Sequence, residues 1–498
     1  MELVGYAAAA ATPYNLLLAF IGVTAGVVLG ALPGISSTFA VAVLLPTTFT
    51  MEPVSALIFL GAVYTGSTYG GAYSAILVNT PGTPQNIATT FDGYPMARRG
   101  DGNLAITLAC LASVVGGLVG AVALWAVAPP LARVALAFGP IEYFWLAVLG
   151  LTMIASLSEG NLVKGATSGC LGLALSLVGV SVVSGDTRFA FSSPALVGGI
   201  NLVPAVIGLL CIPVLIDLVA VRQPHLKQEG TVGGYRLREA LRICRRGWVT
   251  LTRGSLIGTG IGVLPAAGGS IASLVSYSET RRASRRPEAF GSGEPEGVLA
   301  SESANNATVG GGLIPTFVLG IPGTPADAVI LGALLIHGVR TGPSLFTERA
   351  PLIYTFIFGL LIATILMLPV GLLMGRYAYG AIVSVPKTFL VPLVAFFTII
   401  GSFAIHNDVN DVVAMLVLGL FGWLIGRVGI PAAPMVLGLL LGPIAEQGFG
   451  QGVIIGTATG SVWAQFFGRP IALAILALIV VTLFAPYLLR RYTRRIAA

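Results

Sequence analysis

Long, continuous apolar runs recur along the whole chain and predict membrane-spanning helices. These runs lie near residues 14–32, 35–50, 54–78, 103–126, 134–157, 162–183, 196–220, 255–280, 300–338, 351–377, 388–404, 411–428, 433–447 and 470–489. At roughly 20 residues per crossing we expect about 11–14 membrane segments, because several runs are too short or too interrupted by Gly and Pro to be simple spans. The pattern predicts an all-α polytopic membrane protein.

Composition strengthens this prediction. Of the 498 residues, 55% are hydrophobic and only 9% are charged, whereas soluble domains carry about 25% charged residues. The mean hydropathy is +0.91. These values exclude a water-soluble domain, a disordered chain and a nucleic-acid-binding protein. The four cysteines do not have metal-ligand spacing, so we expect neither a disulfide scaffold nor a metal site.

A basic segment near the middle divides the chain. Residues 222–253 contain eight Lys or Arg residues, opposed only by Glu229 and Glu239. Because basic loops stay on the cytoplasmic side, this segment is predicted to be a cytoplasmic linker; the alternative is a solvated loop without topological meaning. The linker separates a predicted N-terminal membrane repeat, residues 1–221, from a C-terminal one, residues 254–498.

A second basic patch indicates a re-entrant hairpin. It comprises Arg281, Arg282, Arg285 and Arg286. If both basic segments are cytoplasmic, residues 254–280 have to enter the membrane and return on the same side. The run from Gly262 to Gly269 contains Pro and several Gly residues, so the hairpin is predicted to turn there, with a second half-helix beginning near Ser270.

Two motifs occur once in each half, in the same order. Gly-Ala-Leu-Pro-Gly at 30–34 resembles Gly-Val-Leu-Pro-Ala at 262–266, and Asn-Thr-Pro-Gly-Thr-Pro at 79–84 resembles Gly-Ile-Pro-Gly-Thr-Pro at 320–325. Such paired broken segments point to the binding site of a transporter built from two repeats. The repeats are inverted relative to each other if each crosses the membrane an odd number of times.

The chemistry of these motifs suits an anion. Thr83 and Thr324 are typical N-cap residues, and each precedes a Pro at the first helical position. The free N–H groups of a new helix and its macrodipole favour negative charge. Gly82 and Gly323 lack a Cβ, which lets the backbone approach a ligand closely. We therefore expect a reversible site for a carboxylate.

The expected substrate-binding residues are the small and polar residues at the four breaks. They are Gly34, Ser36, Ser37, Asn79, Thr80, Gly82, Thr83, Gln85, Asn86, Gly268, Gly269, Ser270, Gly323 and Thr324. The competing interpretation is that the breaks serve only packing and kinks, with Ser and Thr bonded back to their own backbone.

A second group of residues could bind a coupling cation. Ionisable residues at membrane depth are functional candidates, and Asp327 follows the second Pro-Gly-Thr-Pro motif directly. Ser301, Asn305 and Asn306 lie upstream of that motif and offer oxygen ligands. For Asp327, a simple role at the third position of a helix is the alternative.

Several segments together resemble the large membrane subunit of the tripartite tricarboxylate transporters. They are Gly-Ala-Leu-Pro-Gly at 30–34, Tyr-Gly-Gly-Ala-Tyr-Ser-Ala-Ile-Leu-Val-Asn-Thr-Pro-Gly-Thr-Pro at 69–84, Asp-Gly-Tyr-Pro-Met-Ala at 92–97, Ala-Ser-Glu-Ser-Ala-Asn-Asn-Ala at 300–307, Gly-Ile-Pro-Gly-Thr-Pro at 320–325 and Pro-Met-Val-Leu-Gly-Leu-Leu-Leu-Gly-Pro at 434–443. The resemblance covers nearly the whole chain, although the 222–253 linker matches only in being basic.

The resemblance implies a multi-pass protein of the bacterial inner membrane. It implies a small membrane subunit and a periplasmic substrate-binding protein as partners, and import of an organic acid driven by a Na⁺ or H⁺ gradient without another cofactor. The sequence has no Gly-x-x-x-x-Gly-Lys-Ser/Thr, His-Glu-x-x-His or Gly-x-Ser-x-Gly motif, so neither ATP hydrolysis nor another enzymatic activity is expected. The alternative function is a carboxylate channel or uniporter without ion coupling.

Overall fold

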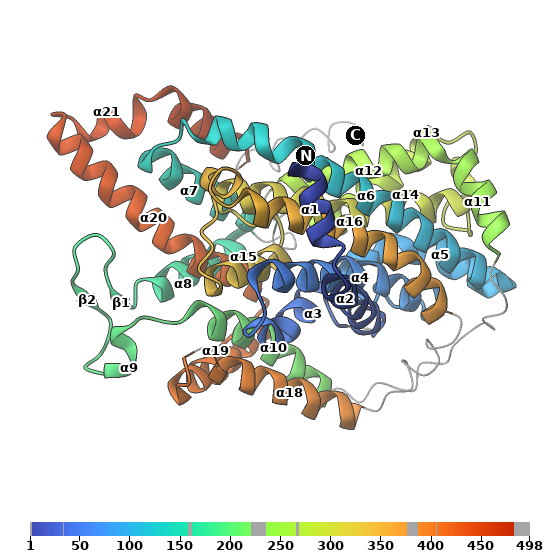
Figure 1. Cartoon of the computed structure of the whole chain (residues 1–498), viewed down its shortest axis with the longest axis horizontal. Coiled ribbons are helices and arrows are strands. Elements are labelled where there is room, and N and C mark those ends of the chain that lie inside the picture. The colour runs from blue at the N-terminus through green and yellow to red at the C-terminus, as the bar shows by residue number, and fades with distance from the viewer. Residues whose placement is uncertain are drawn as a thin grey trace, which may run out of the picture. The chain divides into compact units, whose positions relative to one another are not determined.

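The computed structural model describes residues 2–32, 34–157, 162–220, 236–264, 268–375, 387–404 and 406–482, and these are mostly helical (Figure 1). The strands among them are β1 (Gly179–Val180) and β2 (Thr187–Arg188), which pair antiparallel with Gly179 opposite Arg188. Six helical segments in these ranges are long and apolar enough to cross a membrane: Pro13–Ala31, Pro84–Ala135, Leu202–Val219, Ala350–Leu373, Val409–Arg427 and Ala432–Ala458. The predicted all-α polytopic membrane fold is confirmed.

The chain forms two compact units. Unit 1 comprises Met1–Pro130 and Val214–Ala404, and unit 2 comprises Leu131–Pro213 and Ile405–Ala498. Each unit therefore combines segments from both sequence halves. The helices α6 (Gly102–Ala135) and α10 (Leu202–Ala220) each continue from one unit into the other.

The remaining elements follow in chain order. Unit 1 contains α1 (Glu2–Ala10), α2 (Pro13–Ala31), α3 (Ser37–Leu44), η1 (Leu45–Thr48), α4 (Pro53–Val78), η2 (Pro84–Asn86), α5 (Ile87–Met96), η3 (Ala97–Asp101), α11 (Leu237–Arg246), α12 (Trp248–Val263), α13 (Gly268–Ala283), η4 (Pro287–Ala289), α14 (Pro295–Leu319), α15 (Pro325–Ile336), η5 (Pro343–Phe346), α16 (Ala350–Leu373) and α18 (Lys387–Ala404). Unit 2 contains α7 (Pro140–Leu157), α8 (Leu162–Ser176), α9 (Pro194–Val197), α19 (Val409–Arg427), α20 (Ala432–Ala458) and α21 (Val462–Phe467).

Part of the predicted basic linker is helical. Residues 221–235 lie outside the described residues, but α11 and the start of α12 cover most of 236–253. In α11, Ala240, Ile243 and Cys244 pack on the hydrophobic core of unit 1, while Arg242, Arg245 and Arg246 are exposed. The apolar spacing of three and four residues explains the helix, because it gives this basic segment one face that can be buried.

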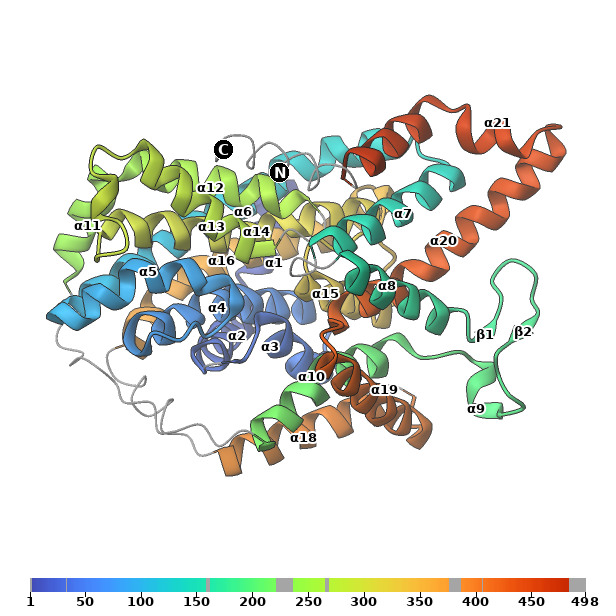
Figure 2. The same cartoon turned by 180° about the vertical axis from the view of Figure 1, so that it is seen from behind.

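Within unit 1, the order of elements in the first half repeats in the second. A short helix and a longer helix come first (α1 and α2; α11 and α12), then a break, a further helix (α3; α13), a long helix (α4; α14) and a second break. A final helix pair (η2–α5 and α6; α15 and α16) completes each series. The helix–break–helix arrangement predicted for 254–280 is present as α12 and α13, which lie side by side next to α14 (Figure 2). Inversion of the two halves stays a prediction.

Glycines allow the long helices of each half to pack backbone against backbone. A Cβ added at Gly30 of α2 would lie 2.2 Å from the Ser67 carbonyl oxygen of α4, and one at Gly258 of α12 would lie 2.1 Å from the Ala304 carbonyl oxygen of α14. Neither helix pair could approach so closely with a side chain at these positions. Small residues at such contacts are typical of helix packing in membranes.

The buried carboxylate of Asp92 joins α5 to the second half. Its Oδ1 accepts hydrogen bonds from the backbone N–H groups of Gly291, Gly293 and Glu294, at 2.8–2.9 Å, and its Oδ2 accepts one from the Tyr277 hydroxyl at 2.8 Å. Four donors satisfy a charge that is costly to bury alone. The turn before α14 is thereby held against α5.

Unit 2 is built on α20, which packs along α7 and α8 (Figures 1 and 2). The buried Glu142 of α7 accepts a hydrogen bond from the Gly139 N–H at 2.8 Å and pairs with Arg469 at 2.7 Å. Arg188 of β2 pairs with Glu446 of α20 at 2.9 Å, which ties the hairpin to this helix. Both pairs connect segments from the two sequence halves.

We expect Gly258→Ala to lower the melting temperature of the purified protein, measured by intrinsic fluorescence. The added methyl group would meet the α14 backbone, and overpacking of this kind costs about 1–3 kcal/mol. Gly260→Ala on the same helix is the matched control, since a Cβ there has no neighbour within 4 Å. Equal melting temperatures for the two variants would contradict the proposed backbone contact.

Candidate functional site

The first break of each half has the same local geometry. Leu32 follows α2 with φ −79° and ψ 120°, and Leu264 follows α12 with φ −79° and ψ 119°. Pro33 and residues 265–267 lie outside the described residues. After the break, Ser36 caps α3 by accepting a hydrogen bond from the Phe39 N–H at 3.1 Å. The start of α13 differs, because its first residue Gly268 has a left-handed φ of 60° and no side chain with which to cap.

The second break is also repeated. Asn79 and Gly320 follow α4 and α14 in the left-handed conformation, with φ 54° and 69°. Thr324 then caps α15, as predicted, by accepting a hydrogen bond from the Asp327 N–H at 3.2 Å. Thr83 makes no such cap among the described contacts; its hydroxyl instead donates to the Asn86 Oδ1 at 2.6 Å, and the helix opens with the 3-10 turn η2.

Gly82 and Gly323 pack against the first break of their own half. A Cβ at Gly82 would lie 2.3 Å from the Gly30 carbonyl oxygen, and one at Gly323 would lie 2.8 Å from the Gly262 carbonyl oxygen. The two breaks of each half thus touch through backbone. Both glycines have a packing reason, and the close approach of a ligand to them stays a prediction.

The two halves meet in a network of buried polar side chains, here called the polar network. Its members are Tyr64, Thr65, Thr68, Asn86, Thr89, Ser113, Ser301, Glu302, Asn305, Asn306, Thr324 and Asp327. Each of these residues is at most 1% exposed. Because polar groups are rarely buried without partners, such a cluster inside an apolar protein indicates a functional site.

One contact shows how the halves are related. The Thr65 hydroxyl donates to the Asn306 Oδ1 at 3.4 Å, and these residues are 241 positions apart. That is also the separation of Pro81 and Pro322 in the two Pro-Gly-Thr-Pro motifs. Contact between a residue and its own equivalent is expected if the two halves are related by a two-fold axis, which stays a prediction like their inversion. The packing agrees, since α3 contacts α15 while α13 contacts α5.

On one side of the Thr65–Asn306 contact the network reaches the second break of the first half. The Asn305 Nδ2 donates to the Thr68 carbonyl at 3.3 Å, and the Ser37 and Thr68 hydroxyls lie 3.4 Å apart. The Ser273 hydroxyl of α13 donates to the Gln85 carbonyl at 2.9 Å. A Cβ at Gly269 would lie 2.7 Å from the Asn305 Oδ1, so the start of α13 closes against this position.

A buried acid that the sequence analysis missed lies on the same side. Glu302 of α14 accepts hydrogen bonds from the Asn86 Nδ2 at 2.9 Å, the Ser113 hydroxyl at 3.0 Å and the Thr89 hydroxyl. Ser301 joins this group, with its hydroxyl 3.0 Å from that of Thr89. A signal was available, since Glu302 lies inside the Ala-Ser-Glu-Ser-Ala-Asn-Asn-Ala segment between two of the predicted residues.

On the other side, Asp327 occupies the position equivalent to Asn86. The Thr324 hydroxyl donates to the Asp327 Oδ2 at 2.8 Å and lies 2.9 Å from the Tyr64 hydroxyl of α4. Within the described residues, the Asp327 Oδ1 has no hydrogen-bond partner although it is buried. The Asn306 Nδ2, the Asn305 Oδ1 and the Gln85 Oε1 also lack partners there.

Among the described residues, no basic side chain is paired with either of these two acids. The fully buried charged residues in the described ranges are acidic, and neither Glu302 nor Asp327 has an ion pair with a Lys or Arg residue there. Hydrogen bonds offset part of the cost of burying such a charge, and a bound cation or a proton would neutralise either carboxyl group. The geometry therefore offers oxygen ligands and negative charge at the centre of unit 1.

Not all of the predicted residues reach this network. Gly34 and Asn79 are exposed at the turns, and the Thr80 hydroxyl donates only to the Val78 carbonyl nearby. Gly268 and Ser270 are half-buried at the start of α13. Other predicted residues lie in the network, or contact it directly or through one neighbour. They are Ser37, Thr83, Gln85, Asn86, Gly269, Thr324 and the four predicted cation ligands.

Comparison with known proteins assigns a family. A family model described as the tripartite tricarboxylate transporter TctA family matches residues 16–437. The chain is 37% identical over 473 residues to a protein of Agrobacterium vitis described as an uncharacterized 52.8 kDa protein in the TAR-I ttuC' 3' region, covering 94% of this chain and 92% of that protein. A protein of the TAR-II ttuC' 3' region in the same organism is 36% identical over 222 residues, covering 44% of this chain and 90% of that protein. No solved structure matches.

The family match spans both breaks of each half, the polar network, and most of the described helices. This multi-pass membrane chain belongs to the tripartite tricarboxylate transporter TctA family, a family of transporters.

Proposed function

We propose that this chain is the large membrane subunit of a secondary transporter that imports an organic acid, a tricarboxylate such as citrate or a related carboxylate. The Na⁺ or H⁺ gradient drives the import. The observation that carries the proposal is the pair of buried carboxyl groups, Glu302 and Asp327, which have no buried base beside them in the described residues. The family supports the transporter role.

The second half supplies the cation site. Asp327 provides a carboxylate oxygen without a partner among the described residues, and the hydroxyl groups of Thr324 and Tyr64 lie beside it. Of the predicted ligands on α14, Asn306 contacts Thr65, the residue after Tyr64, whereas Asn305 contacts Thr68 on the other side of the network. Carboxylate, amide and hydroxyl oxygens suit a hard cation. Because Asp327 lies in the first turn of α15, its negative charge is placed at the positive end of that helix. This end is therefore less suited to hold the acid itself.

The first half supplies the acid site. At the position equivalent to Asp327 it has the neutral Asn86, whose amide holds the Glu302 carboxyl group at 2.9 Å. The proposed acid site at the positive end of η2 and α5 therefore requires Glu302 to be protonated or neutralised by a cation. Hydroxyl, amide and backbone groups near the start of η2 come from Thr83, Gln85, Gly269 and Ser270. A cation bound near Asp327 would compensate the negative charge of an acid bound near Gln85, which couples the two binding events.

The family supports a proposal for the partners. Tripartite transporters consist of a large membrane subunit, a small membrane subunit and a periplasmic substrate-binding protein, so we propose both as partners of this chain in the bacterial inner membrane. The basic segment 222–253 is assigned to the cytoplasmic side. The neighbouring genes test the assembly directly, because both partners should be encoded beside this chain.

Uptake of a labelled acid should require the binding protein and an ion gradient. The experiment reconstitutes the chain with its small subunit in vesicles, adds the matched binding protein, and screens citrate and other di- and tricarboxylates. We expect saturable uptake that stops when both the Na⁺ and H⁺ gradients are collapsed. Uptake that continues without either gradient, and without counterflow, would instead identify a channel.

Asp327→Asn should lower gradient-driven uptake roughly ten- to hundredfold, because interactions with a charged group are worth about 1.5–3 kcal/mol. The substitution preserves the shape of the side chain and copies the equivalent Asn86. Asp101→Asn, which removes an exposed acid, serves as the control and should transport normally at equal protein level. Wild-type uptake by Asp327→Asn, with unchanged ion dependence, would refute the assigned cation site.

Thr324→Ala should reduce the uptake rate while the protein still reaches the membrane. Loss of an N-cap costs about 1 kcal/mol, and the same hydroxyl also holds the Asp327 Oδ2 and faces Tyr64. Thr324→Ser retains the hydroxyl and should remain close to wild type. If Ala and Ser variants transport equally well, the cap does not position the acid group.

A further inference from the structure

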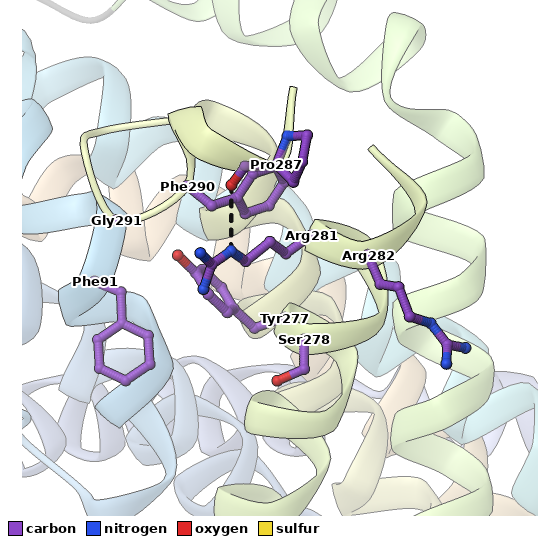
Figure 3. Close-up of a pocket in the computed structure, with 8 residues that line it drawn as sticks. All are labelled: Phe91, Tyr277, Ser278, Arg281, Arg282, Pro287, Phe290 and Gly291. Atoms are coloured by element: carbon purple, nitrogen blue, oxygen red, sulfur yellow. Dashed lines mark hydrogen bonds between the residues drawn. The ribbon is translucent and has the colours of Figure 1, made fainter. Parts of the chain in front are cut away.

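A pocket of about 650 Å³ lies at the end of α13, apart from the polar network. Its lining residues are Phe91, Tyr277, Ser278, Arg281, Arg282, Pro287, Phe290 and Gly291 (Figure 3). They come from α5, from the last two turns of α13 and from the turn at η4. The volume falls in the range of small-molecule sites, roughly 300–1,000 Å³.

The cationic end of the pocket is formed by Arg281. Its Nε donates to the Pro287 carbonyl at 3.2 Å, which holds the side chain across the pocket between Tyr277 and the Pro287–Phe290 turn (Figure 3). No further hydrogen bond of this guanidinium occurs among the described residues. Arg282 extends outward from the rim and pairs with Glu279 of the same helix at 2.6 Å. An anionic group at this end would meet the Arg281 guanidinium, whereas Arg282 is directed away from it.

The floor of the pocket is preformed. The Tyr277 ring contacts Phe91 and Phe290 edge-on, with centroids 5.3 and 5.6 Å apart. The Tyr277 hydroxyl donates to the buried Asp92, whose other oxygen holds the backbone of the turn. A ligand would therefore enter a site whose walls are already fixed, which reduces the ordering cost of binding.

Apolar side chains continue from the pocket away from the arginines. On α5, Ile87 is 40% exposed and Phe91 is 39% exposed, and these two positions lie one turn apart. On α13, Leu274 and Val275 are 37% and 38% exposed, one turn before Ser278. Since α5 and α13 pack together, the surface changes from apolar to cationic along the helices. A soluble anion would contact only the cationic part of this surface, whereas a lipid would contact both the cationic and the apolar part.

We propose that this pocket binds the headgroup of an acidic phospholipid. Its phosphate lies against Arg281, and its acyl chains run along Phe91, Ile87 and Leu274. The arginines belong to a patch whose predicted place is the cytoplasmic side, where basic pockets between membrane helices bind anionic headgroups. The inference concerns a lipid site outside the transport pathway and goes beyond the proposed function.

The test uses the purified full-length chain in detergent, with lipid binding measured by native mass spectrometry. We expect phosphatidylglycerol and cardiolipin to bind, and phosphatidylcholine, glycerol 3-phosphate and inorganic phosphate to bind at least about tenfold more weakly. Equal binding of inorganic phosphate or glycerol 3-phosphate would identify a site for soluble anions and overturn the proposal.

Variants distinguish the pocket from general attraction to the basic patch. Arg281→Gln should weaken phosphatidylglycerol binding about tenfold, since charge-assisted hydrogen bonds to phosphate are lost. Arg281→Lys retains the charge, should weaken binding less, and remains informative if Arg281→Gln fails to fold. Arg282→Gln, Arg285→Gln and Arg286→Gln each remove an equal charge from a side chain that does not face the phosphate and should bind as the wild type does; the Arg282 side chain is 78% exposed. Equal losses in all four glutamine variants, or no loss in Arg281→Gln, would overturn the proposal.

Discussion

A break in a membrane helix leaves backbone groups that hydrocarbon cannot satisfy, and unit 1 contains four breaks. These breaks are covered by contacts within each half and between the two halves. Each half covers its own break with backbone, through Gly30 against Gly82 and Gly262 against Gly323. Each half then packs the helix that follows a break against the other half, with α3 on α15 and α13 on α5. Covering the breaks therefore takes backbone contacts within each half and helix packing between the halves, and both halves contribute to unit 1.

The repeated backbone of the two halves carries different charged residues at equivalent positions. Asn86 and Asp327 occupy equivalent positions beside Gly71 and Gly312, and each receives a hydrogen bond from the Thr three residues earlier. In the first half the charge is supplied instead by Glu302 of the opposite half, whose equivalent position is Gly61. Each second break therefore has one carboxyl group beside it. Asp327 belongs to the same half as its break, whereas Glu302 belongs to the other half. Two sites with different ligands can arise in this way from one repeated backbone.

The sequence predicted what depends on local chemistry. The helix break after Leu264, the N-cap at Thr324 and the repeat of both motifs follow from Gly, Pro and Thr in fixed order, and the structure contains all three. What could not be predicted depends on which distant residues meet. Thr65 lies in the middle of a long helix without any local signal of a site, and its role appears only when α4 and α14 are placed side by side. Glu302 lies among predicted residues, but its partners Asn86, Thr89 and Ser113 are far away in the sequence. Likewise, the helix in the basic segment at 237–246 forms because its apolar face finds a core to cover it.

These contacts limit how the site can move. The first-half helix α5 is fixed near its start by Asn86 on Glu302, and near its end by Asp92 on the turn that precedes α14. Tyr277 of α13 binds the same Asp92, and Ser276 of α13 donates to the Ala300 carbonyl of α14 at 2.7 Å. Separating any one of these three helices from the others would leave a buried carboxylate with lost donors, which is costly. We therefore expect α5, α13 and α14 to move as one body in a transport cycle, with the changes of backbone conformation confined to the breaks.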